Sequence, residues 1–221
     1  HAGIAHFIEH MLFKGTTTRS AEDIAQQIDS IGGQLDAFTS KEYAGYFIKV
    51  LDEHLPLAVD VLSDLVTSPA FDAAEIEREK KVVLEEIKMV EDTPDDLVHE
   101  IFAGAMWPGH PLGRPILGEP DTVSALDRAA LRRYFEDAYV APNFIVAAVG
   151  NLEHGRVRDL VSAAFAKAGA AGTPTAETAP APASEVIVRT KDLEQSHVCL
   201  GGPGISHGDT DRYAAYALNT M

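Results

Sequence analysis

The stretch GIAHFIEHMLFKGT, residues 3–16, carries two histidines and a glutamate within five positions of an otherwise apolar segment. Its apolar side chains recur at helical spacing and predict a helix from about Ala5 to Phe13. His6 and His10 are four residues apart, so both imidazoles project from one face of that helix. Both can therefore reach one metal ion at the roughly 2.0–2.1 Å that is typical of zinc–nitrogen bonds.

Glu9 lies on the edge of the same helical face, three residues after His6. From there its carboxylate can accept a proton from a water molecule that the metal has made more acidic. The alternative is a surface turn with two unrelated histidines. In a chain of this composition, chance would produce the pattern H-x-x-E-H about 0.03 times. The apolar neighbours Phe7 and Ile8 argue against that alternative, because they predict partial burial, where idle polar groups are costly.

A catalytic zinc site takes a third protein ligand and keeps a fourth position open. A long charged helix is predicted over residues 72–92, and on it Glu79 and Glu86 are seven residues apart. Three valines share their face of the helix: Val82, Val83 and Val90. A glutamate among valines points inward and needs a partner. Periodicity does not distinguish the two glutamates, so both remain candidate ligands.

The rest of the chain mixes helical and strand patterns, which predicts an α+β fold. Ser20 is an N-cap for a second helix, with Asp23 at its third position, and residues 34–50 predict a hairpin with a polar turn. A further helix is predicted to bury one apolar stripe: Leu55, Val59, Leu62 and Val66. Apolar runs predict three more strands: residues 143–150, 185–190 and 196–203.

A change of composition predicts the domain organisation. Residues 169–184 are small, polar and Pro-rich, which is typical of an interdomain linker. We therefore place a first domain at residues 1–168 and the beginning of a second at residues 185–221.

Composition also limits the partners. The chain has 18 Lys and Arg against 34 Asp and Glu, and the resulting net charge of −16 would repel nucleic acid. No apolar run approaches the roughly 20 residues that a membrane-spanning helix needs. Cys199 is the only cysteine, so the sequence excludes an intramolecular disulfide.

Four stretches together resemble the pitrilysin family of metallopeptidases: residues 3–16, 32–47, 71–87 and 109–118. The sequence HFIEH is the inverted form of H-E-x-x-H, which defines the inverzincins. Within the family, the chain is most similar to the branch of the mitochondrial processing peptidase beta subunit and its bacterial relatives. The resemblance covers essentially all of residues 1–168, in the order and spacing of the family.

The resemblance implies a role for each site residue. It implies one zinc ion (Zn2+) per chain with His6, His10 and Glu86 as its ligands, and Glu9 as the general base. Glu79 corresponds to an acidic residue that supports the site without binding the metal.

The resemblance also implies a substrate-binding strand. Ala37, Phe38 and Thr39 correspond to an edge strand to which an extended peptide adds through backbone hydrogen bonds. For Phe38, a place in the hydrophobic core is the alternative interpretation.

The resemblance therefore predicts a zinc-dependent metalloendopeptidase that hydrolyses extended or unfolded peptides. The alternative is a non-catalytic structural or partner subunit of the same family. Family subunits consist of two similar α/β halves, so we expect this chain to hold the first half without its N-terminal strands, plus the start of the second. We expect the fragment itself to be inactive, the protein to form a homodimer or heterodimer, and a bacterial cytoplasmic or periplasmic location rather than the mitochondrial matrix.

Overall fold

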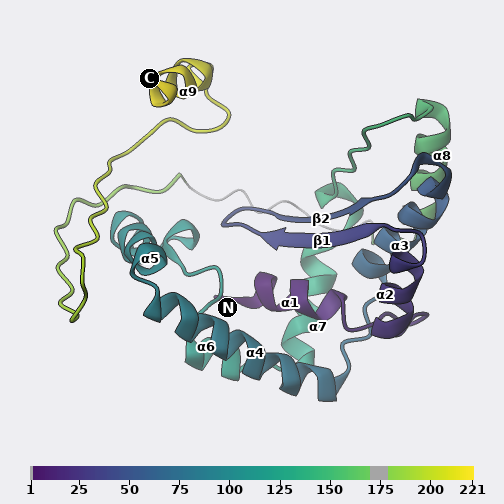
Figure 1. The fold of residues 1–221 in the computed structure, drawn as a ribbon, viewed down its shortest axis with the longest axis horizontal. Helices are drawn as coiled ribbons and strands as arrows, with labels where there is room; N and C mark the ends of the chain where they lie inside the picture. Colours follow the sequence, from purple (N-terminus) through teal and green to yellow (C-terminus); the bar gives the residue numbers. More distant parts are fainter. Residues whose placement is uncertain (1, 170–178) are drawn as a thin grey trace. The chain divides into compact units, whose positions relative to one another are not determined.

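The computed structural model describes residues 2–169 and 179–221 (Figure 1). Backbone contacts group residues 1–92 with 115–178 in one compact unit, and residues 93–114 with 179–221 in another. The predicted linker at residues 169–184 lies largely outside the described residues, so the domain boundaries stay a prediction.

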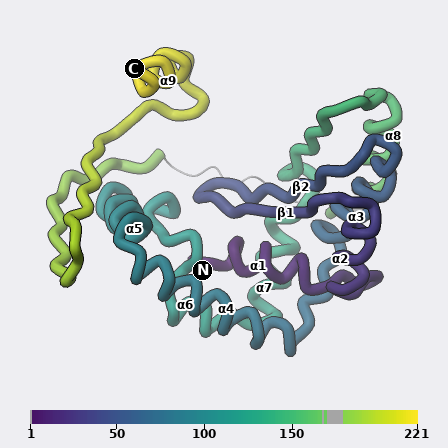
Figure 2. The backbone as a smooth tube through the Cα atoms, viewed as in Figure 1, coloured from purple at the N-terminus to yellow at the C-terminus, as the bar shows by residue number. Residues whose placement is uncertain are grey.

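The first unit contains a two-stranded antiparallel sheet and most of the helices (Figures 1 and 2). Its α-helices and strands are α1 (Ile4–Leu12), α2 (Ala21–Asp29), β1 (Gln34–Thr39), β2 (Ala44–Lys49), α3 (Leu55–Thr67), α4 (Ala73–Asp92), α6 (Pro120–Ser124), α7 (Arg128–Ala138) and α8 (His154–Ala164). Short 3-10 turns lie at η1 (Asp52–His54), η3 (Ala141–Asn143) and η4 (Phe165–Lys167).

The second unit contains α5 (Pro94–Met106), η2 (Pro111–Gly113) and α9 (Arg212–Thr220). Within it, the Ala183 backbone N–H donates to the Met106 carbonyl over 2.9 Å. Among the helices of the described residues, none is both long and apolar enough to cross a membrane.

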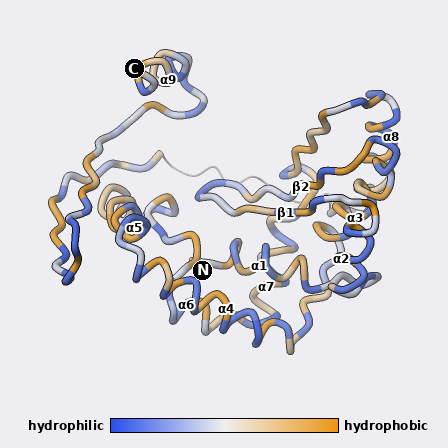
Figure 3. The backbone as a smooth tube through the Cα atoms, viewed as in Figure 1, coloured by the Kyte–Doolittle hydropathy of each residue, from blue (hydrophilic) through white to orange (hydrophobic). Residues whose placement is uncertain are grey.

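Helix α1 is the centre of the first unit. It contacts α4, α7 and both strands, and its side chains Phe7, Ile8 and Leu12 are fully buried. Each of them contributes about 1.5–3 kcal/mol by leaving water. Helix α4 is mixed instead: hydrophilic and hydrophobic stretches alternate along it in Figure 3, so one side of it faces the core and the other faces solvent.

The start of α1 is held by a close backbone crossing. Gly3, the N-cap residue, has φ 84°, and a Cβ there would lie 2.5 Å from the Leu117 carbonyl oxygen. Only glycine accepts both the positive φ and this approach. The crossing therefore sets where α1 begins relative to the loop before α6.

The predicted hairpin and the second helix are confirmed. Ser20 and Asp23 form a reciprocal capping box at the start of α2. Strand β1 pairs with β2 from Gln34 opposite Lys49 to Thr39 opposite Ala44.

Alternation along β1 separates its two faces. Leu35, Ala37 and Thr39 are more buried than their neighbours, whereas Phe38 points outward with 43% of its surface exposed. Its ring lies across Gly45, where a Cβ would come within 2.5 Å of it. The core interpretation of Phe38 is therefore wrong, because strand alternation puts it on the outer face.

The three further strands are not present in the structure. Residues 144–149, 185–190 and 196–203 have no regular secondary structure, and the sheet of the described residues consists of β1 and β2 alone. Ile145 and Val149 are each 97% exposed, although the continuous apolar run predicts burial on both faces. A strand needs a hydrogen-bonded neighbour, and none of the described strands lies beside these segments.

Candidate metal centre

The packing of α1 against α4 brings two histidines and a glutamate together. The Glu86 carboxylate oxygen Oε2 lies 3.8 Å from His6 Nε2 and 3.6 Å from His10 Nε2. The two imidazole rings have centroids 4.6 Å apart and are inclined at 61°. One ligand atom from each of the three residues lies within 4.8 Å of the other two.

The donor set and its burial fit a metal ion. Glu86 Oε2 is buried and has no hydrogen-bond partner among the described residues, and the same holds for His6 Nδ1. A buried acceptor without a partner costs about 1–3 kcal/mol, more when it is charged. A cation between the three groups would remove that cost at Glu86, and two imidazoles with one carboxylate are a donor set of catalytic zinc sites.

His6 is held in the form that binds metals. Burial, together with the smaller effect of the neighbouring His10, lowers the pKa of His6 to about 4. The imidazole is therefore neutral at pH 7, with a lone pair available to a metal.

Glu79 lies behind His10 rather than beside the candidate ligand atoms. Its Oε2 is 3.0 Å from His10 Nδ1, and its Oε1 is 2.6 Å from Lys14 Nζ. Burial raises the pKa of Glu79, but hydrogen bonds from Lys14 and His10 outweigh burial and leave it below its ordinary value. Because an ionised carboxylate only accepts, His10 Nδ1 donates, which leaves His10 Nε2 free on the side of Glu86.

The two candidate glutamates thus occupy different positions. Glu86 lies at both histidine Nε2 atoms, whereas Glu79 is bonded to the far nitrogen of one histidine. Lys14 was not predicted as part of this cluster. Its position four residues after His10, just past the end of α1, was an available signal.

Glu9 projects toward the sheet. The Thr39 hydroxyl donates a hydrogen bond to Glu9 Oε2. Tyr46 and Tyr139 lie close enough for the Glu9 carboxylate to raise their pKa values, and their hydroxyls are 2.7 Å apart. Burial is the main cause in both, and it raises the pKa of Tyr139 to about 12, so both phenols stay protonated at pH 7.

Sequence patterns gave no signal for the tyrosine pair. Tyr46 and Tyr139 are 93 residues apart, and only the packing of β2 near α7 brings their hydroxyls together. The predicted substrate strand, Ala37 to Thr39, forms the end of β1 next to Glu9. Its second edge has no partner strand among the described residues, and its peptide-binding role stays a prediction.

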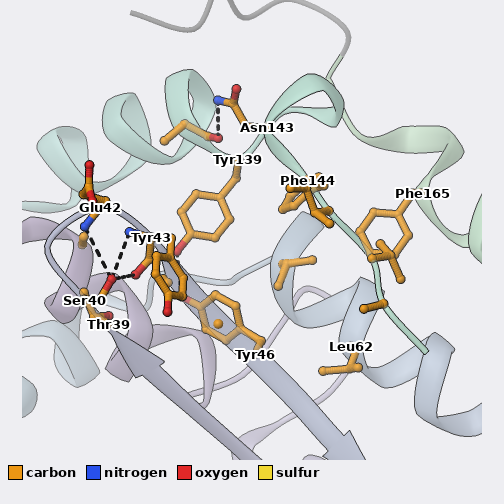
Figure 4. A pocket seen from close by; sticks show the side chains of 18 of the residues that line it. Thr39, Ser40, Glu42, Tyr43, Tyr46, Leu62, Tyr139, Asn143, Phe144 and Phe165 are labelled. Atoms are coloured by element: carbon orange, nitrogen blue, oxygen red, sulfur yellow. Dashed lines mark hydrogen bonds between the residues drawn. The ribbon is translucent and has the colours of Figure 1, made fainter. Parts of the chain in front are cut away.

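A hollow of about 780 Å³ begins beside Thr39 and extends away along β2. Figure 4 shows aromatic side chains lining it from the turn before β2, from β2, from the end of α7 and from the segments around η3 and η4. They are Tyr43, Tyr46, Tyr139, Phe144 and Phe165. The wall of the hollow is therefore mainly apolar, with the turn residues Ser40 and Glu42 at one end.

Residues 1–120 match insulinase, peptidase family M16, and residues 125–221 match the peptidase M16 inactive domain. The chain belongs to peptidase family M16. The predicted resemblance to the pitrilysin metallopeptidases is thereby confirmed.

Named M16 relatives include zinc proteases. The chain is 44% identical, over 99% of its length, to the uncharacterized zinc protease YmxG of Bacillus subtilis, and covers 53% of that protein. It is 35% identical, again over 99%, to a probable mitochondrial-processing peptidase subunit beta of Arabidopsis thaliana, and covers 42% of it. The chain thus spans about half the length of these relatives.

The fold is also that of solved M16 structures. A protease from Helicobacter pylori superposes with a TM-score of 0.75 at 24% identity, over 80% of this chain and 43% of that one. This likeness supports the α+β fold that the sequence predicts, which here is rich in helices and has a small sheet.

Proposed function

We propose that the protein to which this chain belongs is a zinc-dependent endopeptidase, with one zinc ion held by His6, His10 and Glu86. The observation that carries the proposal is the convergence of Glu86 Oε2 on both histidine Nε2 atoms, within 4 Å of each. The names of the M16 relatives support zinc as the metal.

Zinc, when bound, supplies Lewis acidity toward a water molecule and a substrate carbonyl. Glu9 is the general base: its carboxylate takes a proton from the attacking water and returns it to the leaving amine nitrogen. Neutral His6 and the Glu79-bound His10 keep their Nε2 atoms available as ligands. Tyr46 and Tyr139, whose hydroxyls are hydrogen-bonded to each other, line the hollow that begins beside Thr39.

The substrate in this proposal is an extended peptide. Its backbone would pair with β1 at Ala37, Phe38 and Thr39, which end beside Glu9. A folded chain has no free strand to offer, so unfolded or flexible peptides are favoured. A homodimer or heterodimer as the working unit remains a prediction, and size-exclusion chromatography with light scattering of the full-length protein would measure it.

The test is Glu9→Gln in the full-length protein. We expect cleavage of a quenched fluorescent peptide to fall by at least about 1,000-fold, because the base is lost, while metal analysis still finds one zinc per chain. His6→Ala is the matched variant and should lose both zinc and cleavage.

The alternative is a non-catalytic partner subunit, for which the match of residues 125–221 to an inactive domain is the relevant observation. A wild-type protein that holds zinc but cleaves no peptide would favour that alternative. Cleavage that survives Glu9→Gln would refute the role of Glu9.

A further inference from the structure

The side chain that contacts the proposed base comes from the strand proposed to bind substrate. Thr39 Oγ1 donates to Glu9 Oε2, and the two residues are 30 positions apart in the chain. Each carboxylate oxygen can accept separately, so this bond leaves Glu9 Oε1 to take a proton.

The hairpin sets the direction of the Thr39 side chain. Thr39 is the last residue of β1 and pairs with Ala44, so it shares the inner face with Ala37. The turn beyond it is closed by the Ser40 N–H, which donates to the Tyr43 carbonyl over 2.8 Å. The Ser40 hydroxyl accepts from the Tyr43 N–H over 3.2 Å and donates to the Tyr43 carbonyl over 2.9 Å (Figure 4).

The chemistry of threonine suits this position. A β-branched side chain has a restricted χ1 angle, so a strand residue of this type holds its hydroxyl in one direction at low entropic cost. Valine has the same shape without the hydroxyl, and serine has the hydroxyl without the restriction. Comparing threonine, valine and serine at this position therefore distinguishes the effect of the hydrogen bond from the effect of side-chain packing.

We propose that Thr39 is a positioning residue for the general base: its hydroxyl fixes one oxygen of Glu9, and thereby orients the other. The inference rests on the proposed function, and it adds a side-chain role to the backbone role proposed for the same residue. One residue then joins the substrate strand to the base, so a peptide that pairs with the end of β1 also steadies Glu9.

The test compares Thr39→Val with Thr39→Ser in the full-length, zinc-loaded protein. We expect Thr39→Val to lower kcat by about 10–100-fold, as loss of a supporting hydrogen bond does in metal sites, with KM and zinc affinity within about threefold of wild type. Thr39→Ser should keep kcat within about threefold, because it keeps the donor.

Thr67→Val is the matched control. The Thr67 hydroxyl is also partly buried and donates to the Ser63 carbonyl within α3, away from the metal centre. Its removal should leave kcat unchanged, and thermal unfolding would verify that each variant is folded.

Three kinetic results would overturn the inference: an unchanged kcat in Thr39→Val, a rise in KM alone, or an equal loss in Thr39→Ser. Crystal structures of the same variants give a readout that does not depend on cleavage. The Glu9 carboxylate should be displaced in Thr39→Val and retained in Thr39→Ser. If the wild type proves inactive, the proposed function fails, and the position of Glu9 in Thr39→Val still decides this inference.

Discussion

Replacing Lys14 by methionine would remove the cation from Glu79 and keep an unbranched side chain of similar length. The ion pair is close, at 2.6 Å, and the Glu79 side chain is 5% exposed against 33% for Lys14. Breaking a buried pair costs about 3–5 kcal/mol, whereas an exposed pair contributes about 0–1 kcal/mol. With one buried and one partly solvated partner, we expect a loss of about 1–2 kcal/mol.

Thermal unfolding of the zinc-free, full-length protein would measure this loss. A destabilisation of about 1–2 kcal/mol corresponds to a fall in Tm of about 2–8 °C for the unit that contains the site. Because Lys14 also holds the carboxylate that orients His10, we expect zinc affinity, measured by chelator competition, to fall by about tenfold.

Lys88→Met is the matched control, because it removes a lysine from an ion pair that is exposed. Lys88 pairs with Glu85 over 2.7 Å on α4, but the two side chains are 63% and 68% exposed. Solvent screens an exposed pair of this kind, so Tm should fall by less and zinc affinity should not change. Equal losses of Tm and zinc affinity in Lys14→Met and Lys88→Met would show that the burial of Glu79 does not strengthen its ion pair with Lys14. That result would refute the prediction.

Two further predictions concern the ligand assignment and acid stability. Glu86→Gln should lower zinc affinity by at least about 1,000-fold and Glu79→Gln by about 10–100-fold, since one removes a proposed ligand and the other its proposed support. Chelator competition would measure both affinities, and equal losses would contradict the assignment. Burial raises the pKa of Asp64, but hydrogen bonds from Thr16, Arg19 and Thr18 outweigh burial and hold it below its ordinary value. The stabilisation is therefore present above about pH 4 and lost as pH falls through the lower folded-state pKa. Asp64→Asn should reduce Tm at pH 7 and flatten its fall between about pH 5 and 2, and parallel acid profiles of the two proteins would contradict this.

Local patterns predicted the elements that build the site. The capping box of α2, the hairpin and the long charged helix follow from caps, alternation and periodicity. They were predictable because each depends on residues a few positions apart.

Helix faces were less predictable. In α3, Val66 of the predicted stripe is buried, but the residues with least exposure are Val61 and Leu65. The other predicted residues, Leu55, Val59 and Leu62, are only half-buried, and the last two line the hollow. In α4, Val83 is buried as predicted, but Val82 is 43% exposed. Both helices have apolar residues on more than one face, and only their neighbours decide which face is covered.

By itself, the sequence determined that His6 and His10 share a helical face, because the α-helix repeats every 3.6 residues. It also determined that Ala37 and Thr39 share a strand face, because side chains alternate. It left Glu79 and Glu86 equivalent as ligands, and only the resemblance to a family separated them.

Tertiary structure decided the rest. The packing of α4 on α1 puts Glu79 at His10 Nδ1 and Glu86 near both Nε2 atoms, although the two glutamates share one helical face. The packing of β1 on α1 puts the Thr39 hydroxyl on Glu9. A backbone period sets directions within one element, whereas distances between elements depend on how side chains far apart in the sequence fill the core.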